Sequence, residues 1–568
     1  VAELVQVGIP CSEEVFVERA AAAGHPRSLT CHVEPVVSAC AKANFEEPAA
    51  DLASFRISSM KYWIGRAEAL KHKEQQLHAD LPEHLRPILK GKRLLLLREM
   101  MEAAGCEDGA LVDHICQGFR LSGWLPASGE FVARLILGTQ KELDAGWVWL
   151  DEGPLPEGVV IAMRFGIMQN KLRVIDDLSC CGLNATVGLL EKFCLHTIDK
   201  LASMMAYAFD VVKGPMPECV GVGSVAAFLR ISIALWRIGT VLFKLFWSAY
   251  FDDYSVISSK QLGANAQWTV ENLFDLLGFR FAKSGSKAAP FGTTFEMLGL
   301  CVDLTKVQHR VMKVGHTSKR KDELHRYLQE ILSKGSLDSK AAERLRGRMV
   351  FVEGFSFGRV SNRAQRIIGR CAEKPVATTL SEDLQSALRW LDSRVCESEP
   401  LSIDRNMIRT VLVFTDGACN PEEGTGGVGG VLVSASGRVC EFFGEAVPSS
   451  LMDKLLSFSE NPIFELELIP LLICLKIWVP LLKGSQVVFY LDNDGARHSM
   501  IRTYGGSSFA EKVIETFLLL ENALELKTWF SRVPTSSNIA DNPSRLVFQP
   551  LLKRGAARRA VPWDCLLP

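Results

Sequence analysis

The sequence predicts a multidomain α+β and α/β protein whose last large domain is a mixed five-stranded sheet with flanking helices. Its 568 residues allow about three or four domains at roughly 100–200 residues each. Apolar residues make up 48% of the chain and charged residues 23%, which excludes a wholly disordered protein. Short strand patterns begin near residue 159, and a regular alternation of strands and helices begins at Thr410.

Changes in composition and periodicity divide the chain into segments. The predicted segments are 1–125, a helical leader of unknown role; 126–303, short strands and helices; 304–374, basic and helical; 375–408, a linker; 409–545, an α/β domain; and 546–568, a tail. The linker is predicted from its polar composition and its two prolines. Since the sequence opens on Val1 rather than Met, we expect it to be a piece of something longer.

The cysteine content and the apolar runs indicate where in the cell we expect the protein to be. The 16 cysteines include no Cys-x-x-Cys pair, which disfavours a zinc domain and is typical of reduced core residues in a nuclear or cytoplasmic protein. No secretory signal opens the sequence. The longest apolar runs, 233–250 and 463–482, both contain charged residues, so we expect no membrane span. The oligomeric state is left open.

Positive charge is concentrated in residues 306–374, although the whole chain carries a net charge of −1. This stretch holds 17 Lys and Arg against 7 Asp and Glu, and its periodicity is helical. One interpretation is the solvated face of a helical segment. The other is a groove for a nucleic-acid backbone, because Lys and Arg that neutralise phosphates release counterions.

Four carboxylates follow the predicted elements of the 409–545 domain in order. Asp416 and Asp492 each end a strand, Glu467 lies in a helix, and Asp541 opens a short terminal helix. An Asp-Gly pair after a strand is usually only a turn, but four acids placed in this way can converge on one point. Clustered anions repel one another unless a metal balances them. Two Mg²⁺ ions about 4 Å apart, for which Mn²⁺ can substitute, would activate water and stabilise the leaving oxygen in phosphodiester hydrolysis.

These residues resemble the RNase H domain of retroelement polymerases. The resemblance rests on Phe-Thr-Asp-Gly-Ala at 414–418, Leu-Asp-Asn at 491–493, the strand 529–534 and Asn-Ile-Ala-Asp at 538–541. It implies a metal site made of Asp416, Glu467, Asp492 and Asp541. It also implies the RNA strand of an RNA–DNA hybrid as the substrate.

The second metal ligand has an alternative in the sequence. Glu465 lies two residues before Glu467, and the two side chains point to different faces of the helix, so only one can serve. The Glu-Leu-hydrophobic-Pro pattern of the family favours Glu467.

A second resemblance lies upstream of this domain. Ala-Tyr-Phe-Asp-Asp-Tyr at 249–254 resembles the Tyr-x-Asp-Asp hairpin of reverse transcriptases, whose tight turn pushes carboxylates toward Mg²⁺. The resemblance implies a partial right-hand polymerase, with fingers and palm in 126–303 and a thumb in 304–374. It implies Asp252 and Asp253 as metal ligands, and an RNA–DNA hybrid or a template–primer duplex as the partner.

Further motifs extend this resemblance along the chain. The stretch 171–178, followed by Gly-Leu-Asn, resembles the fingers motif, which implies Arg173 at the triphosphate of an incoming nucleotide. Gly223 and Ser224 resemble the segment beside the template and the nucleotide. Leu-x-Gly-Arg at 345–348 resembles the thumb of DIRS-like retrotransposons. The nucleic-acid contacts that we expect in this basic thumb are those of Arg344, Arg346, Arg348 and Arg359.

The sequence departs from the polymerase family at the first catalytic acid. The family places this acid in an Asp-x-x-x-Ala-Tyr strand before Gly223, and only Asp199 and Asp210 stand in that interval, neither in that context. We infer that about 40 residues of palm are missing, since the short interval after Asp210 cannot hold the strand, helix and strand of the family. Pro215 and Pro217 predict that Asp210 lies on a loop rather than on the strand beside the hairpin.

Three functions remain open from the sequence. The first is a retroelement-derived reverse transcriptase/RNase H fragment, inactive as a polymerase and able to cleave hybrids with two metals. The second is a non-catalytic remnant or a protein that only binds nucleic acid. The third, an unrelated metal-dependent nuclease, is disfavoured by the upstream motifs. Mg²⁺-dependent cleavage of a hybrid separates the first from the second.

Overall fold

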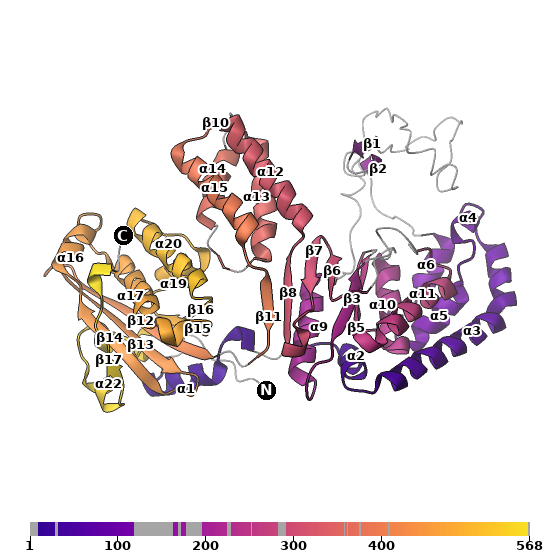
Figure 1. Cartoon of the computed structure of the whole chain (residues 1–568), viewed down its shortest axis with the longest axis horizontal. Helices are drawn as coiled ribbons and strands as arrows, with labels where there is room; N and C mark the ends of the chain where they lie inside the picture. The colour runs from indigo at the N-terminus through magenta and orange to yellow at the C-terminus, as the bar shows by residue number, and fades with distance from the viewer. Residues whose placement is uncertain are drawn as a thin grey trace. The chain divides into compact units, whose positions relative to one another are not determined.

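The chain forms two units, and the boundary between them does not follow the order of the sequence. One unit combines residues 1–31 with 299–568, and the other is residues 32–298 (Figure 1). The computed structural model describes residues 10–28, 32–118, 163–168, 172–177, 196–223, 229–251, 253–281, 291–356, 358–359, 362–373, 377–406 and 409–565. Among the helices in these ranges, none combines the length and the apolar character that a membrane span needs.

The N-terminal part is helical, as predicted, but it is not a separate leader. Helix α1 (Glu13–Ala23) belongs to the first unit. The helices of the second unit are α2 (Pro35–Phe45), α3 (Ala49–Asp80), α4 (Arg86–Leu89), α5 (Leu94–Ala103), α6 (Leu111–Gln117), α9 (Ile198–Val211), α10 (Leu229–Phe243) and α11 (Gly263–Leu277). Buried Arg56 on α3 donates from Nε to the carbonyl of Phe243 at 2.9 Å, and from Nη2 to Asn44 Oδ1 at 3.0 Å. These bonds join α2 and α3 to the end of α10, so the predicted leader 1–125 is divided between the two units.

The predicted hairpin that carries the Asp-Asp pair is present in the second unit. Strand β4 (Trp247–Tyr250) pairs antiparallel with β5 (Asp253–Ser259), and β3 (Cys219–Gly223) pairs with the other edge of β5. The turn has two residues, and Phe251 takes a φ of 47°, the sign that a tight turn of this length favours. A second antiparallel hairpin joins β1 (Met163–Met168) and β2 (Leu172–Asp177), and β6 (Thr294–Met297) ends the unit.

A close contact fixes α10 against this hairpin. The indole Nε1 of Trp236 donates to the carbonyl of Trp247 at 2.9 Å, and the indole Nε1 of Trp247 donates back to the carbonyl of Trp236 at 3.1 Å. A Cβ on Gly239 would lie 2.1 Å from the Trp247 ring, so only glycine lets the helix approach this closely. Both indole rings are thereby buried with their N–H groups satisfied.

Residues 304–374 form helices, as predicted, but the segment after them is not a linker. The elements of this region are β7 (Leu300–Asp303), β8 (Val311–His316), α12 (Ser318–Lys334), β9 (Ser336–Leu337), α13 (Ser339–Gly354), α14 (Asn362–Ala372), β10 (Thr378–Thr379), α15 (Glu382–Glu397) and β11 (Leu401–Asp404). Leu384, Leu388 and Leu391 lie on one face of α15 and are buried in a core shared with α12 and α13. Strand β11 pairs antiparallel with β8. The prediction of a linker at 375–408 is therefore wrong, because a single apolar stripe makes this polar segment a core helix.

The C-terminal domain is built on a mixed sheet in the order β16-β15-β12-β13-β14-β17. The strands are β12 (Thr410–Asn420), β13 (Thr425–Ser434), β14 (Val439–Ala446), β15 (Gln486–Leu491), β16 (Lys527–Arg532) and β17 (Ala557–Arg558). The first three pair antiparallel, whereas β15 pairs parallel with both β12 and β16. The five predicted strands are confirmed. The predicted tail, 546–568, instead adds α22 (Gln549–Lys553) and the two-residue strand β17 to the domain.

Helices cover both faces of this sheet (Figure 1). Helices α17 (Ile463–Ile477) and α20 (Ser508–Ala523) bury one face, with α16 (Ser449–Leu456), α18 (Val479–Leu482) and α19 (Asp494–Arg502) at its margin. The other face is covered by α21 (Asp541–Ser544), α22 and α1, which comes from the opposite end of the sequence. The site described next lies where β12 and β15 meet these layers.

Candidate metal centre in the C-terminal domain

Three of the four predicted acids converge in the C-terminal domain. Asp416, Glu467 and Asp492 each offer one carboxylate oxygen, and these atoms lie within 4.8 Å of one another. Asp416 lies on β12, and Asp492 directly follows β15, the parallel neighbour of β12. Glu467 comes from α17, which packs against β12, and the exposed fraction is 4% for both Asp416 and Glu467. The second and third acids of the predicted order thus meet the first at one place.

Gly417 explains how Glu467 comes so close to the strand. A Cβ on Gly417 would lie 2.6 Å from the carbonyl carbon of Leu466 and 2.8 Å from the nitrogen of Glu467. The backbone of α17 therefore rests directly on β12 at the position next to Asp416. The backbone N–H of Gly417 also hydrogen-bonds to the Glu467 carboxylate. Any other residue at 417 would push the helix, and Glu467 with it, away from Asp416.

The fourth acid, Asp541, lies at the start of α21 and outside the three-acid group. Its side chain is 31% exposed and accepts a bond from Arg545 Nη2 at 2.9 Å. Its negative charge nevertheless acts on the group, because it raises the pKa of Asp416, Glu467 and Asp492. Two glycines of β13 allow this approach: a Cβ on Gly429 would lie 2.5 Å from Ser544 N, and one on Gly427 would lie 2.0 Å from Ser544 O. The glycine-rich strand is therefore the surface on which α21 rests.

Two neutral side chains that the sequence analysis did not select hold Asp416. Ser544 Oγ donates to Asp416 Oδ2 at 2.5 Å, and Asn538 Nδ2 donates to Asp416 Oδ1 at 3.4 Å and to the carbonyl of Thr415 at 3.1 Å. Both donors flank Asp541 at a spacing of three residues. That Asn-x-x-Asp-x-x-Ser spacing was visible in the sequence, but its partner on β12 was not. These bonds orient the carboxylate of Asp416 toward the other acids.

The alternative ligand, Glu465, does not join the group. Its Oε1 accepts a hydrogen bond from Ser507 Oγ at 2.7 Å, at the start of α20. Two residues along a helix are about 200° apart, so Glu465 and Glu467 face different sides. The structure thus places Glu467, and not Glu465, beside Asp416. The role of Glu467 as a metal ligand remains a prediction.

The environment of the three acids disfavours their charged forms. Burial, together with the charge of Asp492, raises the pKa of Asp416 to about 7. Burial and the charges of Asp416 and Asp492 raise the pKa of Glu467 to about 10. Burial also raises the pKa of Asp492, although hydrogen bonds from Thr535 and Asn538 oppose this. Three carboxylates in this position require protons or a cation to balance them.

The oxygen atoms of the group fit a hard divalent cation. Glu467 Oε2 and Asp492 Oδ1 are buried, and no hydrogen-bond donor of the described residues reaches either atom. Buried acceptors without a donor are rare in proteins and call for a specific explanation. Carboxylate oxygens are the ligands that Mg²⁺ prefers, and it is usually bound by few of them with water completing the shell. The donor set therefore fits Mg²⁺ or Mn²⁺ and does not suit a thiolate-seeking metal.

The predicted polymerase residues are only partly brought together. Asp253 begins β5 and is half-buried, whereas Asp252 and Ser224 lie outside the described residues. Gly223 ends β3, the strand beside the hairpin, and the five residues of β3 include no acid. Asp210 lies in the last turn of α9 rather than on a loop, so that part of the prediction is wrong. Arg173 lies on β2, with its side chain outside the described part of the chain.

Three of the four expected nucleic-acid contacts are exposed, and the fourth is not. Arg344, Arg346 and Arg348 all lie exposed on α13. Arg359, in contrast, donates from Nη2 and Nε to the buried carboxylate of Glu521 at 2.9 and 3.3 Å, and from Nη1 to the carbonyl of Met500 at 3.1 Å. Its guanidinium is thus engaged in an ion pair with the C-terminal domain. The expectation that Arg359 contacts nucleic acid conflicts with this bonding.

A second group of metal-ligand side chains is accounted for by hydrogen bonds. His325, Asp392 and Cys396 lie within 4.8 Å of one another on α12 and α15. Asp392 Oδ1 is bonded to His325 Nδ1 at 2.7 Å, and Asp392 Oδ2 accepts from Gln329 Nε2 at 2.7 Å. Burial raises the pKa of the Cys396 thiol, which keeps it protonated. Its hydrogen bonds therefore form a polar link between α12 and α15.

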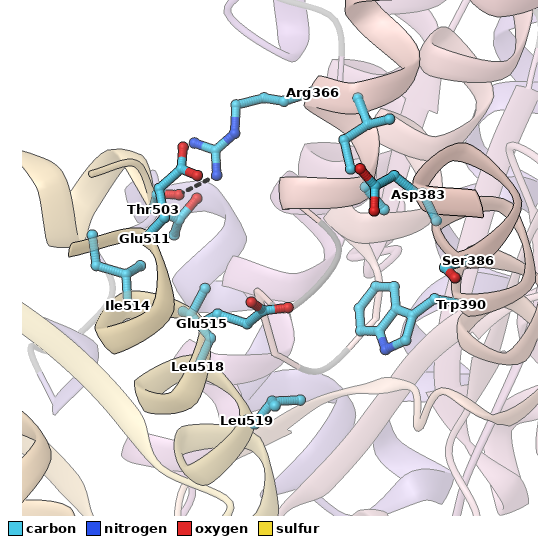
Figure 2. A pocket seen from close by; sticks show the side chains of 13 residues that line it. Arg366, Asp383, Ser386, Trp390, Thr503, Glu511, Ile514, Glu515, Leu518 and Leu519 are labelled. Carbon is cyan, nitrogen blue, oxygen red and sulfur yellow. Dashed lines mark hydrogen bonds between the residues drawn. The ribbon is translucent and has the colours of Figure 1, made fainter. Parts of the chain in front are cut away.

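A cavity of 290 Å³ lies between α14, α15 and α20, away from the acid group (Figure 2). Figure 2 shows Trp390 and Asp383 on one side and Glu511 and Glu515 on the other. Arg366, on the same side as Trp390, bonds across to the carbonyl of Thr503 at 2.5 Å. Three acidic side chains in the lining repel phosphate, so this cavity is no site for a nucleic-acid backbone.

Comparison with known proteins gives a likeness of fold only. No protein-family profile and no curated protein matches the sequence. RNase H1 from the archaeon Halobacterium salinarum NRC-1 aligns with 25% of this chain and 98% of its own, at 16% identity and a TM-score of 0.21. The foamy viral protease–reverse transcriptase dRH in complex with double-stranded DNA aligns with 72% of this chain and 73% of its own, at 13% identity and a TM-score of 0.40. The foamy viral protein in complex with an RNA/DNA hybrid aligns with 78% of this chain and 64% of its own, at 11% identity and a TM-score of 0.38. TM-scores this low assign no function to the chain. Evidence for its function has to come from its side chains.

The raised pKa values predict how the metal-free protein responds to pH. The folded state keeps protons on Asp416 and Glu467 that the unfolded chain releases, so the unfolding free energy should fall as the pH rises above about 5. Glu467→Gln removes the more perturbed acid and should flatten this fall, with a melting temperature above that of the wild type at alkaline pH. Calorimetry across the pH range in EDTA measures both effects.

Glu465→Gln is the matched control for this experiment. It lies on the same helix and keeps the acceptor that Ser507 uses. It should leave the pH dependence unchanged. Identical pH profiles for Glu467→Gln and the wild type would contradict the electrostatic account of the group.

Proposed function

We propose that the C-terminal domain is a metal-dependent hydrolase of phosphodiester bonds, of the RNase H type, that acts on the RNA strand of RNA–DNA hybrids. The observation that carries this proposal is the close group of buried Asp416 and Glu467 with half-buried Asp492, in which Glu467 Oε2 and Asp492 Oδ1 have no donor among the described residues. Three carboxylates this close together, with no cation to balance them, would carry a large cost in desolvation. The order of the acids along the sheet, with Asp541 beside them, supports the RNase H type over an unrelated nuclease.

Each residue of the site has a defined task in this proposal. Two Mg²⁺ ions, when bound, supply an activated water and stabilise the leaving oxygen of the scissile phosphate. Asp416, Glu467 and Asp492 hold the ions through their carboxylates, and Ser544 and Asn538 keep Asp416 in its orientation. Asp541, which is partly exposed, completes the ligand set once its bond to Arg545 opens. Gly417 allows the close approach of α17 to β12 that places Glu467 there.

The first test is cleavage of a hybrid by the full chain. Asp492→Asn keeps the shape of the side chain but removes the charge that holds a cation, and we expect it to lower Mg²⁺-dependent cleavage about 100-fold or more. The measurement is release of labelled RNA fragments from an RNA–DNA hybrid, with double-stranded RNA and double-stranded DNA as substrates for comparison.

The neighbouring acid offers a control for Asp492→Asn. Asp494 bonds instead to Arg497 at 2.9 Å and to Arg532 at 3.3 Å, outside the acid group. Asp494→Asn should retain cleavage. Absence of cleavage by the wild type with either Mg²⁺ or Mn²⁺ would favour the alternative, a non-catalytic remnant that only binds nucleic acid.

We further propose that the chain derives from the polymerase of a DIRS-like retrotransposon, and that it is a nuclear or cytoplasmic protein. The Tyr-Phe-Asp-Asp turn and the Leu-x-Gly-Arg pattern at 345–348 support this origin. The polymerase half is inactive in this proposal, because the family's first catalytic acid has no counterpart. The absence of any acid from β3, the strand beside the hairpin, supports that view.

The polymerase proposal predicts that the chain does not extend a primer. Asp252 and Asp253 supply two carboxylates, and a two-metal site that lacks a bridging ligand places its ions poorly. A template–primer extension assay with Mg²⁺ and with Mn²⁺ measures this. Templated extension that disappears in Asp252→Ala would show that the site is complete and the proposal wrong.

The basic face of α13 predicts how hybrid binding depends on salt. Arg344, Arg346 and Arg348 are exposed, so each can neutralise one phosphate. Replacing all three with Ala should reduce the slope of log affinity against log salt by up to about 0.9 for each lost contact, on the scale of duplex DNA. Titrations at several salt concentrations measure the slope. Arg389→Ala on α15, whose partner is Gln385, should leave it unchanged; equal slopes for all variants would make the basic run only a solvated face.

A further inference from the structure

The first residues of the chain pack inside the C-terminal domain. Helix α1 shares a core with β12, β13 and β15, in which Phe16, Val17 and Ala20 have exposed fractions of 3% or less. The residues that they meet lie about 400 to 540 positions further along the chain. Apolar burial this complete is typical of an internal element of a domain and not of a loosely attached arm.

Phe16 touches the two strands that carry Asp416 and Asp492. Its ring packs edge-on against Phe414, at 6.2 Å between centroids, and against Tyr490, at 5.5 Å. Phe414 and Tyr490 precede the two acids by two residues, and side chains two apart on a strand share a face. The two rings also stack on each other at 4.8 Å. Helix α1 therefore covers the face of the sheet on which Phe414 and Asp416 lie, one step along β12.

Hydrogen bonds from the same segment hold both ends of the loop that leads into α21. At the first end, the backbone N–H of Cys11 donates to Ser537 Oγ at 3.0 Å, and Ser537 Oγ donates to the carbonyl of Cys11 at 2.7 Å. At the other end, Asn542 Nδ2 donates to Glu13 Oε1 at 2.9 Å. Ser537 precedes Asn538, which bonds to Asp416, and Asn542 follows Asp541.

We infer that residues 10–28 complete the hydrolase site as a positioning element: they fix the loop 537–542, and with it Asn538 and Asp541, over the acid group. The inference rests on the proposed function for its catalytic consequence, but not for the association itself. The C-terminal domain is therefore assembled from two distant segments of the chain. Glu13 is a positioning residue, because its Oε1 holds the loop through Asn542, while its Oε2 lies 3.7 Å from Arg554 Nη2.

The association is tested in the full chain by cutting its covalent link. A recognition sequence for a site-specific protease, inserted between Ser28 and Pro35, allows the segment to be cleaved after folding. We expect the N-terminal fragment to co-elute with the rest of the chain in gel filtration. A cation that binds the folded acid group raises the melting temperature of the uncut chain, and we expect the same rise with Mg²⁺ in the cut chain. A fragment that separates while the rise in melting temperature is unchanged would overturn the inference.

Point variants of the uncut chain test the positioning role. Glu13→Ala removes the acceptor for Asn542 and should lower kcat for hybrid cleavage about 100-fold, if the loop moves by about 1 Å. The affinity for the hybrid should stay the same. Glu13→Gln keeps an oxygen acceptor and should restore most of the activity. Equal kcat values for Glu13→Ala and the wild type would overturn the positioning role.

A matched pair on α1 separates packing from positioning. Phe16→Ala removes the contacts with Phe414 and Tyr490 and should release the cleaved fragment, whereas Val15→Ala, at a position 38% exposed, should not. If the wild type cleaves no hybrid, the proposed function fails. Co-elution and the Mg²⁺-dependent melting temperature still decide the inference in that case.

Discussion

Three carboxylates close to one another, two of them buried and one half-buried, are the constraint on which the C-terminal domain depends. Burial raises the pKa of each, the charge of Asp492 raises the pKa of Asp416, and the charges of Asp416 and Asp492 raise the pKa of Glu467. Attraction from Arg545 offsets only part of this, because that side chain is largely exposed and bonded to Asp541. Nearby features act to hold the acids where repulsion would separate them: the glycines that let α17 and α21 rest on the strands, and the neutral donors Asn538 and Ser544.

The C-terminal domain and the upstream hairpin differ in whether acidic side chains are gathered at the centre of the structure. In the C-terminal domain Asp416 lies on a strand, Glu467 lies on a helix and Asp492 directly follows a strand. These three elements share a common core, which brings the acids together. In the upstream hairpin, pairing and packing are complete without any acid on β3, since Trp236 and Trp247 join the helix to the strands. Strand pairing and apolar packing therefore account for this backbone arrangement without a contribution from acidic side chains on β3.

The sequence was most informative where pattern and burial coincide. The five long strands and the three acids that converge were predictable. The clearest signal was in β12 and β15, where a continuous apolar run is followed by polar residues that include Asp416 and Asp492. Helix α15 was missed because most of its residues are polar or charged, and the apolar residues that pack in the core form a single stripe. Strand β17 has two residues, too few to make a pattern. The ion pair of Arg359 was not predictable. Its partner, Glu521, is 162 residues away along the chain, and only the fold brings the two side chains together.

The position of α1 has a consequence for the order of events during synthesis. Ribosomes release the N-terminus first, and the strands that cover Phe16 and Val17 emerge only after several hundred further residues. Until then the apolar face of α1 has no native partner, and closing so long a loop carries an entropic cost that grows slowly with its length. Helix α1 therefore leaves the ribosome well before its native contacts can form, and its apolar face is open to holdase chaperones during that interval.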